Sequence, residues 1–183
     1  MSNKYTHRLA TLEDITTIKE LMNLAIYELQ VDHLNAEQLR AAHQFMGLDT
    51  GLIDDQTYFL ILSAEGTVRE TVVGCGGWGK RETLYGGSHT VGRSNALLDP
   101  SIDRARVRAM YCHPKWARRG VGTYIINLVE NKARSEGFKK MTLGATLGGE
   151  KLYGWLGYKV TERCVDNTDD GIEVPLIKME KDF

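Results

Sequence analysis

The sequence predicts one mixed α/β domain in which helices pack on a central sheet. Its 183 residues are enough for one hydrophobic core, whereas a second independent core would be cramped. Hydrophobic residues make up 42% and charged residues 26%, close to the averages of globular proteins. The segments expected from hydrophobic periodicity follow the order β, α, α, β, β, β, α, β, α, β, β. We therefore expect residues 1–183 to form a single domain.

The first third of the chain predicts a strand followed by two helices. Residues 5–9 have strand character, and apolar side chains at intervals of three and four predict an amphipathic helix over 15–29. A second helix is expected to begin after the cap residue Asn35 and to run to about Met46, where Gly47 ends it.

The middle of the chain predicts a hairpin and then a long segment. Two strands, 58–62 and 68–75, are expected around a turn at Glu65 and Gly66. The segment 79–103 is rich in Gly, Ser and charged residues. It is too long for an idle connection, so we expect a functional loop or partial structure.

The last part of the chain predicts alternating strands and helices. Apolar spacing predicts a helix that starts at Val121, and Gly137 occupies the usual place of a C-terminal glycine. The other expected elements are a strand over 104–112, a strand over 140–145, a short helix over 150–155, and a terminal hairpin of 157–164 and 172–180.

Charge and cysteine content exclude several classes of function. A net charge of -1 gives no global attraction to nucleic acid or to an anionic membrane. Neither a signal-peptide core nor an 18-residue apolar run is visible, so we expect a cytoplasmic protein. Cys75, Cys112 and Cys164 contain no C-x-x-C pair, and the five histidines form no metal-binding motif. We expect reduced thiols and no metal site.

The stretch 113–124, HPKWARRGVGTY, joins a predicted strand to a predicted helix. A helix N-terminus offers free N–H groups and the positive end of the helix dipole to an anion. Glycine at 120 and 122 lets an anion approach the backbone, and Arg118 and Arg119 add charge in a fork geometry suited to phosphate. The pattern predicts a pyrophosphate cradle. The alternative is an ordinary tight turn with solvated arginines.

Two motifs carry a resemblance to a known family. The run VRAMYCHP at 107–114, followed by RRGVG, resembles the acetyl-CoA motif of the GCN5-related N-acetyltransferase (GNAT) superfamily, and LYGWLGY at 152–158 resembles its second signature. The resemblance implies the GNAT fold, a central, mixed, mostly antiparallel twisted sheet of about six to seven strands flanked by helices, with splayed parallel central strands. The sequence departs from the family at Ala117, where Gln or Arg is common, and at 104–106, where many members carry a glutamate base.

The resemblance also implies an activity. The chain would transfer an acetyl group from acetyl-CoA to a primary amine of a small molecule or protein, by direct attack in a ternary complex. The pantetheine arm would add to the main chain like a strand, and Tyr153 would donate a proton to the departing thiolate. The implied cofactor-binding residues are Met110, Tyr111, Cys112, Arg118, Arg119, Gly120, Val121, Gly122 and Thr123.

Several alternatives stay open at this point. The same cradle would serve a non-catalytic acyl-CoA-binding module. The run GCGGWG at 74–79 fits a dinucleotide fingerprint, although the residues after it do not predict a helix, which favours a strand bulge and turn. Chemistry alone makes Glu82 and His89 candidates for the general base.

The acceptor side is expected to involve the first two helices and the final hairpin, which contribute Tyr27, Glu28, Asp32, His33 and the run 166–170, DNTDD. The expected partner is a small-molecule or peptide amine, without nucleic acid or membrane. Homodimers are common among small enzymes of this kind, and the sequence marks no interface.

Overall fold

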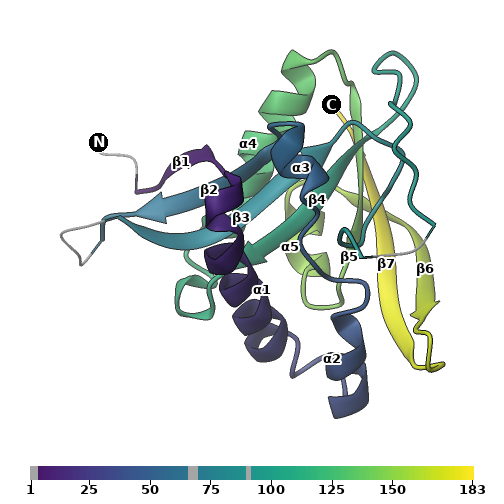
Figure 1. Cartoon of the computed structure of the whole chain (residues 1–183). Helices are drawn as coiled ribbons and strands as arrows, with labels where there is room; N and C mark the ends of the chain where they lie inside the picture. Colours follow the sequence, from purple (N-terminus) through teal and green to yellow (C-terminus); the bar gives the residue numbers. More distant parts are fainter. Residues whose placement is uncertain (1–3, 66–69, 90–91) are drawn as a thin grey trace.

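The computed structural model describes residues 4–65, 70–89 and 92–183. Over these residues the strands form one sheet in the order β1-β2-β3-β4-β5-β7-β6 (Figure 1). Every neighbouring pair is antiparallel except β4 and β5, which run parallel. The expected mixed, mostly antiparallel sheet is therefore confirmed. The strands are β1 Thr6–Leu9, β2 Tyr58–Ser63, β3 Thr71–Gly79, β4 Ala105–Cys112, β5 Lys140–Ala145, β6 Lys159–Asn167 and β7 Glu173–Asp182.

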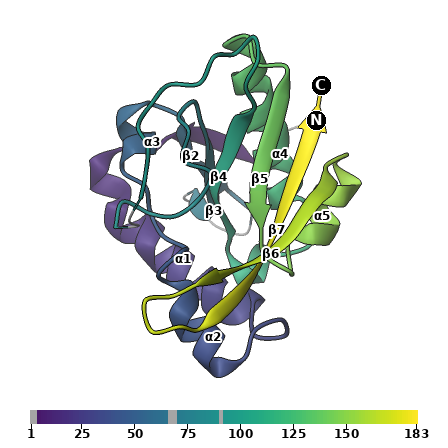
Figure 2. The ribbon, with the colours of Figure 1, turned by 90° about the vertical axis from the view of Figure 1, so that its right-hand side faces the viewer.

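Helices cover both faces of this sheet. Because side chains alternate along a strand, Tyr58 and Leu60 of β2 join the core under α1 and α3, while Phe59 and Ile61 join the core under α4. Figures 1 and 2 show α1 and α4 on opposite sides of the sheet. The helices are α1 Ile15–Leu29, α2 Ala36–Ala42, α3 Gly51–Asp54, α4 Val121–Ser135 and α5 Glu150–Trp155, with 3-10 turns at Leu12–Asp14 and Pro114–Trp116. None of the described helices is long and apolar enough to cross a bilayer.

The GCGGWG run lies inside β3, which continues to Gly79. The predicted bulge is present, because the register with β4 shifts between Cys75 and Gly77, but the predicted turn is not. The glycines let α4 pack closely on the sheet. A Cβ at Gly74 would lie 2.6 Å from Val121 Cγ1, and one at Gly76 would lie 2.7 Å from Ile125 Cγ2. Since no helix follows this run, it lacks the helix N-terminus that a dinucleotide fingerprint needs.

Two other expectations differ from the structure. The second helix ends at Ala42 rather than near Met46, because the chain turns there and carries Leu48 and Asp49 into buried positions. The short helix α3 follows directly and was not predicted. The turn expected at 65–66 and the first two residues of the arm expected at 68–75 fall largely outside the described residues.

The parallel strands β4 and β5 separate soon after they begin. They pair only at Ala105 with Met141 and at Arg106 with Thr142. Ala109 has a positive φ of 46°, at the point where β4 changes register against β3. The buried Tyr58 hydroxyl donates to the carbonyl of Ala109 at 2.7 Å and holds this bulge in place. The later half of β4 therefore has no strand partner on the β5 side.

Candidate active site

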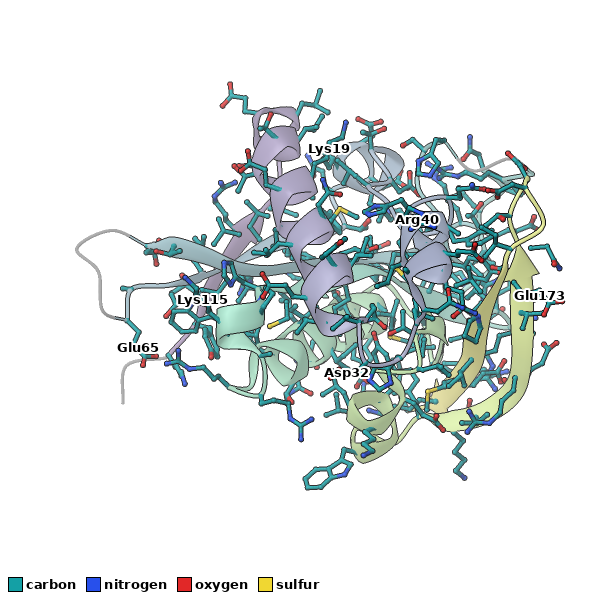
Figure 3. The ribbon with its side chains drawn as sticks, turned by 90° about the horizontal axis from the view of Figure 1, so that it is seen from below. Lys19, Asp32, Arg40, Glu65, Lys115 and Glu173 are labelled. Atoms are coloured by element: carbon teal, nitrogen blue, oxygen red, sulfur yellow. The ribbon has the colours of Figure 1, made fainter. Side chains whose placement is uncertain are left out.

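A cavity of about 950 Å³ opens where β4 and β5 diverge. This volume is at the upper end of the range usual for small-molecule pockets. Its walls come from the end of α1, the segment after α2, β4, the start of α4, β5, α5 and the β6–β7 hairpin. In Figure 3, seen from below, Asp32 marks the end of α1 beside α5. Gly148 permits this approach, because a Cβ there would lie 3.0 Å from the His33 ring.

The expected pyrophosphate cradle lies at one end of this cavity. Arg118 and Gly120 have positive φ values of 60° and 94°, and Gly120 is the N-cap of α4. The N–H groups of the first turn have no acceptor within the helix, and α4 is 15 residues long, so its dipole favours an anion there. A Cβ at Gly120 would meet nothing within 4 Å, so the backbone conformation, and not a lack of space, selects glycine at this position. Gly122 lines the cavity and also lets α4 approach α5 closely, because a Cβ there would lie 2.6 Å from Leu152 Cδ2.

Two predicted cofactor-binding residues point their side chains away from the cavity. The Val121 side chain is buried in the core under α4. The Arg119 guanidinium lies 4.2 Å from the Trp116 ring centre and 2.5 Å from a carboxylate oxygen of Glu65. Figure 3 labels Glu65 on the side of the molecule that carries Lys115 and the cradle segment. Only the main chain of Arg119 and Val121 is therefore available to an anion, whereas Arg118 itself lines the cavity.

The later half of β4, which is paired with β3 and open on the β5 side, forms the cavity wall next to the cradle. Met110 and Cys112 face the core under α4, Tyr111 faces the α1 side, and all three line the cavity. Burial raises the pKa of the Cys112 thiol to about 11. Because the thiolate is the nucleophile, a protonated Cys112 favours a packing role over that of a covalent acyl carrier.

The predicted proton donor, Tyr153, lies on α5 and is buried against the same wall. Its hydroxyl is 3.9 Å from the sulfur of Met110, and its ring packs edge-on to Tyr158 at 6.0 Å between centres. Gly149 makes room, because a Cβ there would lie 2.9 Å from Cε2 of Tyr153. Burial raises the pKa of Tyr153, so the phenol carries its proton at neutral pH. This is the state that a general acid requires.

A buried ionic cluster, which sequence reasoning missed, fixes the long segment after β3. Arg108 of β4 donates to Asp49 Oδ2 at 2.9 Å and to the carbonyls of Thr83 and Gly86 at 3.0 and 2.8 Å. Arg93 donates to the same Asp49 oxygen at 2.5 Å. The available signal was the pair of arginines, Arg106 and Arg108, in a predicted strand, of which Arg108 is buried. The cluster holds residues 83–86 over the cavity.

The part of the cavity next to the β6–β7 hairpin, where we expect the acceptor, contains Tyr85 and Asp166. The Tyr85 hydroxyl donates to Asp166 Oδ1 at 2.9 Å, and both residues line the cavity. Burial and this neighbouring carboxylate raise the pKa of Tyr85, which keeps it a donor. Among the described lining residues, Asp166 is the only carboxylate. Gln38 of α2 donates to the carbonyl of Glu173 at 2.8 Å, which joins α2 to the start of β7.

Other residues considered for the acceptor side or as a base do not line the cavity. Glu82 is exposed and accepts from the Ser94 hydroxyl at 2.7 Å. His89 is exposed, and its Nε2 lies 3.1 Å from the carbonyls of His43 and Gln44. Of the remaining acceptor-side candidates His33 lines the cavity, and those absent from its walls are Tyr27, Glu28, Asp32, Asn167, Thr168, Asp169 and Asp170. In the part of the chain that the structure describes, no three His, Cys, Asp or Glu side chains gather as a metal site would require.

Sequence comparison gives one family match. A family model described as the acetyltransferase (GNAT) family matches residues 23–158. No curated protein matches the chain at a significant level.

Solved structures share the fold at low sequence identity. A GCN5-related N-acetyltransferase from Rhodopseudomonas palustris is 19% identical with a TM-score of 0.70, over 100% of this chain and 98% of that one. The putative acetyltransferase yncA from Salmonella typhimurium, solved with acetyl-CoA, is 20% identical with a TM-score of 0.61, over 98% and 94%. The ribosomal-protein-S18-alanine N-acetyltransferase from Escherichia coli is 14% identical with a TM-score of 0.55, over 97% and 93%.

Proposed function

The chain belongs to the acetyltransferase (GNAT) family and is an acetyl-CoA-dependent acyltransferase, and from this premise we propose that it acetylates a primary amine of a small molecule or protein. The reaction is direct attack of the amine on the thioester in a ternary complex. We propose residues 1–183 as a single N-acetyltransferase domain. One observation carries the proposal: the opening between β4 and β5 joins a helix-terminal anion cradle to a buried, protonated tyrosine in one cavity.

The donor is proposed to bind in two parts. The amides from Arg118 to Thr123 hold the pyrophosphate, with the Arg118 side chain as counter-charge. The pantetheine arm lies in the opening and pairs with the main chain of Met110, Tyr111 and Cys112. The lack of a strand partner for this half of β4 on the β5 side supports that placement, because backbone N–H and C=O groups require partners.

The acetyl transfer then follows from positions on the same wall. The amine nitrogen attacks the thioester carbon, and a backbone N–H of β4 stabilises the oxyanion of the tetrahedral intermediate. When the C–S bond breaks, the thiolate takes the proton of the Tyr153 hydroxyl. The 3.9 Å approach of this hydroxyl to Met110 supports the role, because Met110 belongs to the strand proposed to hold the pantetheine arm.

Tyr153→Phe separates a transferase from a non-catalytic acyl-CoA-binding module. The hydroxyl has only a long contact to a sulfur, so its removal should leave the fold intact. We expect turnover to fall by about 10²- to 10⁴-fold, the usual worth of a general acid, with an unchanged Kd for coenzyme A by calorimetry. Tyr158→Phe is the control, because it removes the hydroxyl of the adjacent tyrosine, and Tyr158 does not line the cavity. Unchanged turnover in the Tyr153 variant would remove the proposed acid, and absence of turnover in the native chain with a full amine panel would favour the binding module.

A further inference from the structure

Two buried hydrogen-bond acceptors in the cavity have no partner. Among the described residues, three buried side-chain polar atoms lack one: Gln30 Oε1, Arg93 Nε and Asp166 Oδ2. Gln30 and Asp166 both line the large cavity, and Arg93 does not. Native proteins satisfy nearly all buried polar atoms, so an unpartnered pair in one cavity points to a ligand. Because each atom is an acceptor, a ligand group that meets either of them must be a hydrogen-bond donor.

The carboxylate of Asp166 is held ready for such a donor. Its Oδ1 is occupied by the Tyr85 hydroxyl, which leaves Oδ2 for the ligand. Tyr85 is in turn fixed, since its ring packs over Gly144, where a Cβ would lie 3.0 Å away. Arg108 also donates a hydrogen bond to the carbonyl of Gly86, the residue that follows Tyr85. The acceptor end of the cavity thus contains one oriented negative charge.

Asp166 lies far from the proposed reaction centre. It is on β6, and the sheet order places β7 between β6 and β5 (Figure 2). Two strand spacings therefore separate it from the opening beside β5, a distance of about 10 Å. A carboxylate at this distance from the opening is positioned for a different part of the acceptor than the nitrogen that attacks the thioester.

We propose that Asp166 binds a second protonated nitrogen of the acceptor, with Gln30 as a further hydrogen-bond acceptor in the same cavity, so that the substrate class is a di- or polyamine. The inference rests on the proposed amine acetylation and specifies its acceptor. A monoamine has no group for Asp166, and the carboxylate of an amino acid is repelled by it. Among the residues that the structure describes, three cationic side chains line the cavity: Arg108, Arg118 and Lys151. Arg108 is already neutralised by Asp49, whereas Arg118 belongs to the cradle and Lys151 to α5.

The test compares unbranched aliphatic diamines with monoamines of the same chain length. Asp166→Asn keeps the shape of the side chain and removes its charge, and Asp169→Asn is the matched control from the same hairpin, outside the cavity. We expect Asp166→Asn to raise the KM for diamines by about 10- to 100-fold, the worth of a charge-assisted hydrogen bond, with little change in kcat. The KM for monoamines should not change, and Asp169→Asn should behave as the native chain. Tyr85→Phe, which loosens the carboxylate, should raise the diamine KM by a smaller factor.

A second readout does not depend on turnover. Calorimetry measures diamine binding to the coenzyme A complex of the native chain and of the Asp166→Asn variant. If diamines bind only when Asp166 is present, but no amine is acetylated, the proposed function is refuted and the subsite is supported. Acetylation of diamines and monoamines with equal KM, unaffected by Asp166→Asn, would overturn the subsite and leave the proposed function in place.

Discussion

Asp49 neutralises two buried or nearly buried arginines, so removal of its charge should be among the most destabilising single changes. The side chain of Asp49 is 3% exposed, and those of Arg108 and Arg93 are 3% and 19% exposed. Asp49→Asn preserves the volume but leaves both guanidinium groups without a counter-charge. Breaking a buried ion pair by removing one partner costs about 3–5 kcal/mol. For a domain of this size, that loss corresponds to a Tm about 6–20 °C lower.

Urea denaturation followed by tryptophan fluorescence measures this loss, with Asp54→Asn as the control. Asp54 is an exposed acid of the neighbouring helix α3, so its neutralisation should stay within about 0.5 kcal/mol of the native chain. Adding Arg93→Gln to Asp49→Asn removes one uncompensated cation and should recover part of the loss, which a double-mutant cycle quantifies. The reasoning is refuted if Asp49→Asn and Asp54→Asn have equal free energies of unfolding.

Three further outcomes are expected. Gly120→Ala places a residue with a Cβ at a φ of 94°, so it should lower the free energy of unfolding by about 1–2 kcal/mol and weaken coenzyme A binding. The control Gly154→Ala, whose Cβ would lie in open space on α5, should do neither. Equal unfolding curves for the two variants would contradict this reasoning. Because the pKa of Cys112 is about 11, its alkylation rate by mass spectrometry should keep rising up to about pH 11, and a plateau near pH 9 would contradict the raised value. The hydrogen bond from Arg8 lowers the pKa of Asp14 from 3.8 to about 2, so its stabilisation is complete above about pH 4 and lost as the pH falls through 2. Asp14→Asn should remove this part of the acid transition in a stability–pH profile.

The local geometry of the proposed cradle could be predicted because all its determinants are adjacent in the chain. The strand, Arg118, Gly120 and the helix follow one another within a few residues, and a positive φ at a helix cap selects glycine locally. Most helices and strands could also be predicted locally, because burial on one face of an element repeats at a fixed interval along the sequence.

The acceptor end could not be predicted in the same way. Tyr85 and Asp166 are 81 residues apart, and Arg108 meets Asp49 across 59 residues. Nothing local distinguishes Asp166 from the neighbouring Asp169 and Asp170 of the same hairpin. Only the sheet order brings β6 to one cavity wall and leaves the hairpin tip outside it. The roles of Gly74 and Gly76 were also hidden, because glycines in a strand suggest a bulge as readily as close packing.

The close packing of α4 on β3 sets a fixed spacing between two attachment points. A donor that binds the start of α4 with its pyrophosphate and β4 with its pantetheine arm spans two separate elements, whose separation is fixed by contacts of Gly74 and Gly76 with Val121 and Ile125. Packing in the core thus sets the length of donor that can bind both elements at once. Replacing either glycine by a larger residue would shift α4, and with it the cradle, relative to β4. A substitution wholly inside the core would therefore misplace the acetyl group of the bound donor.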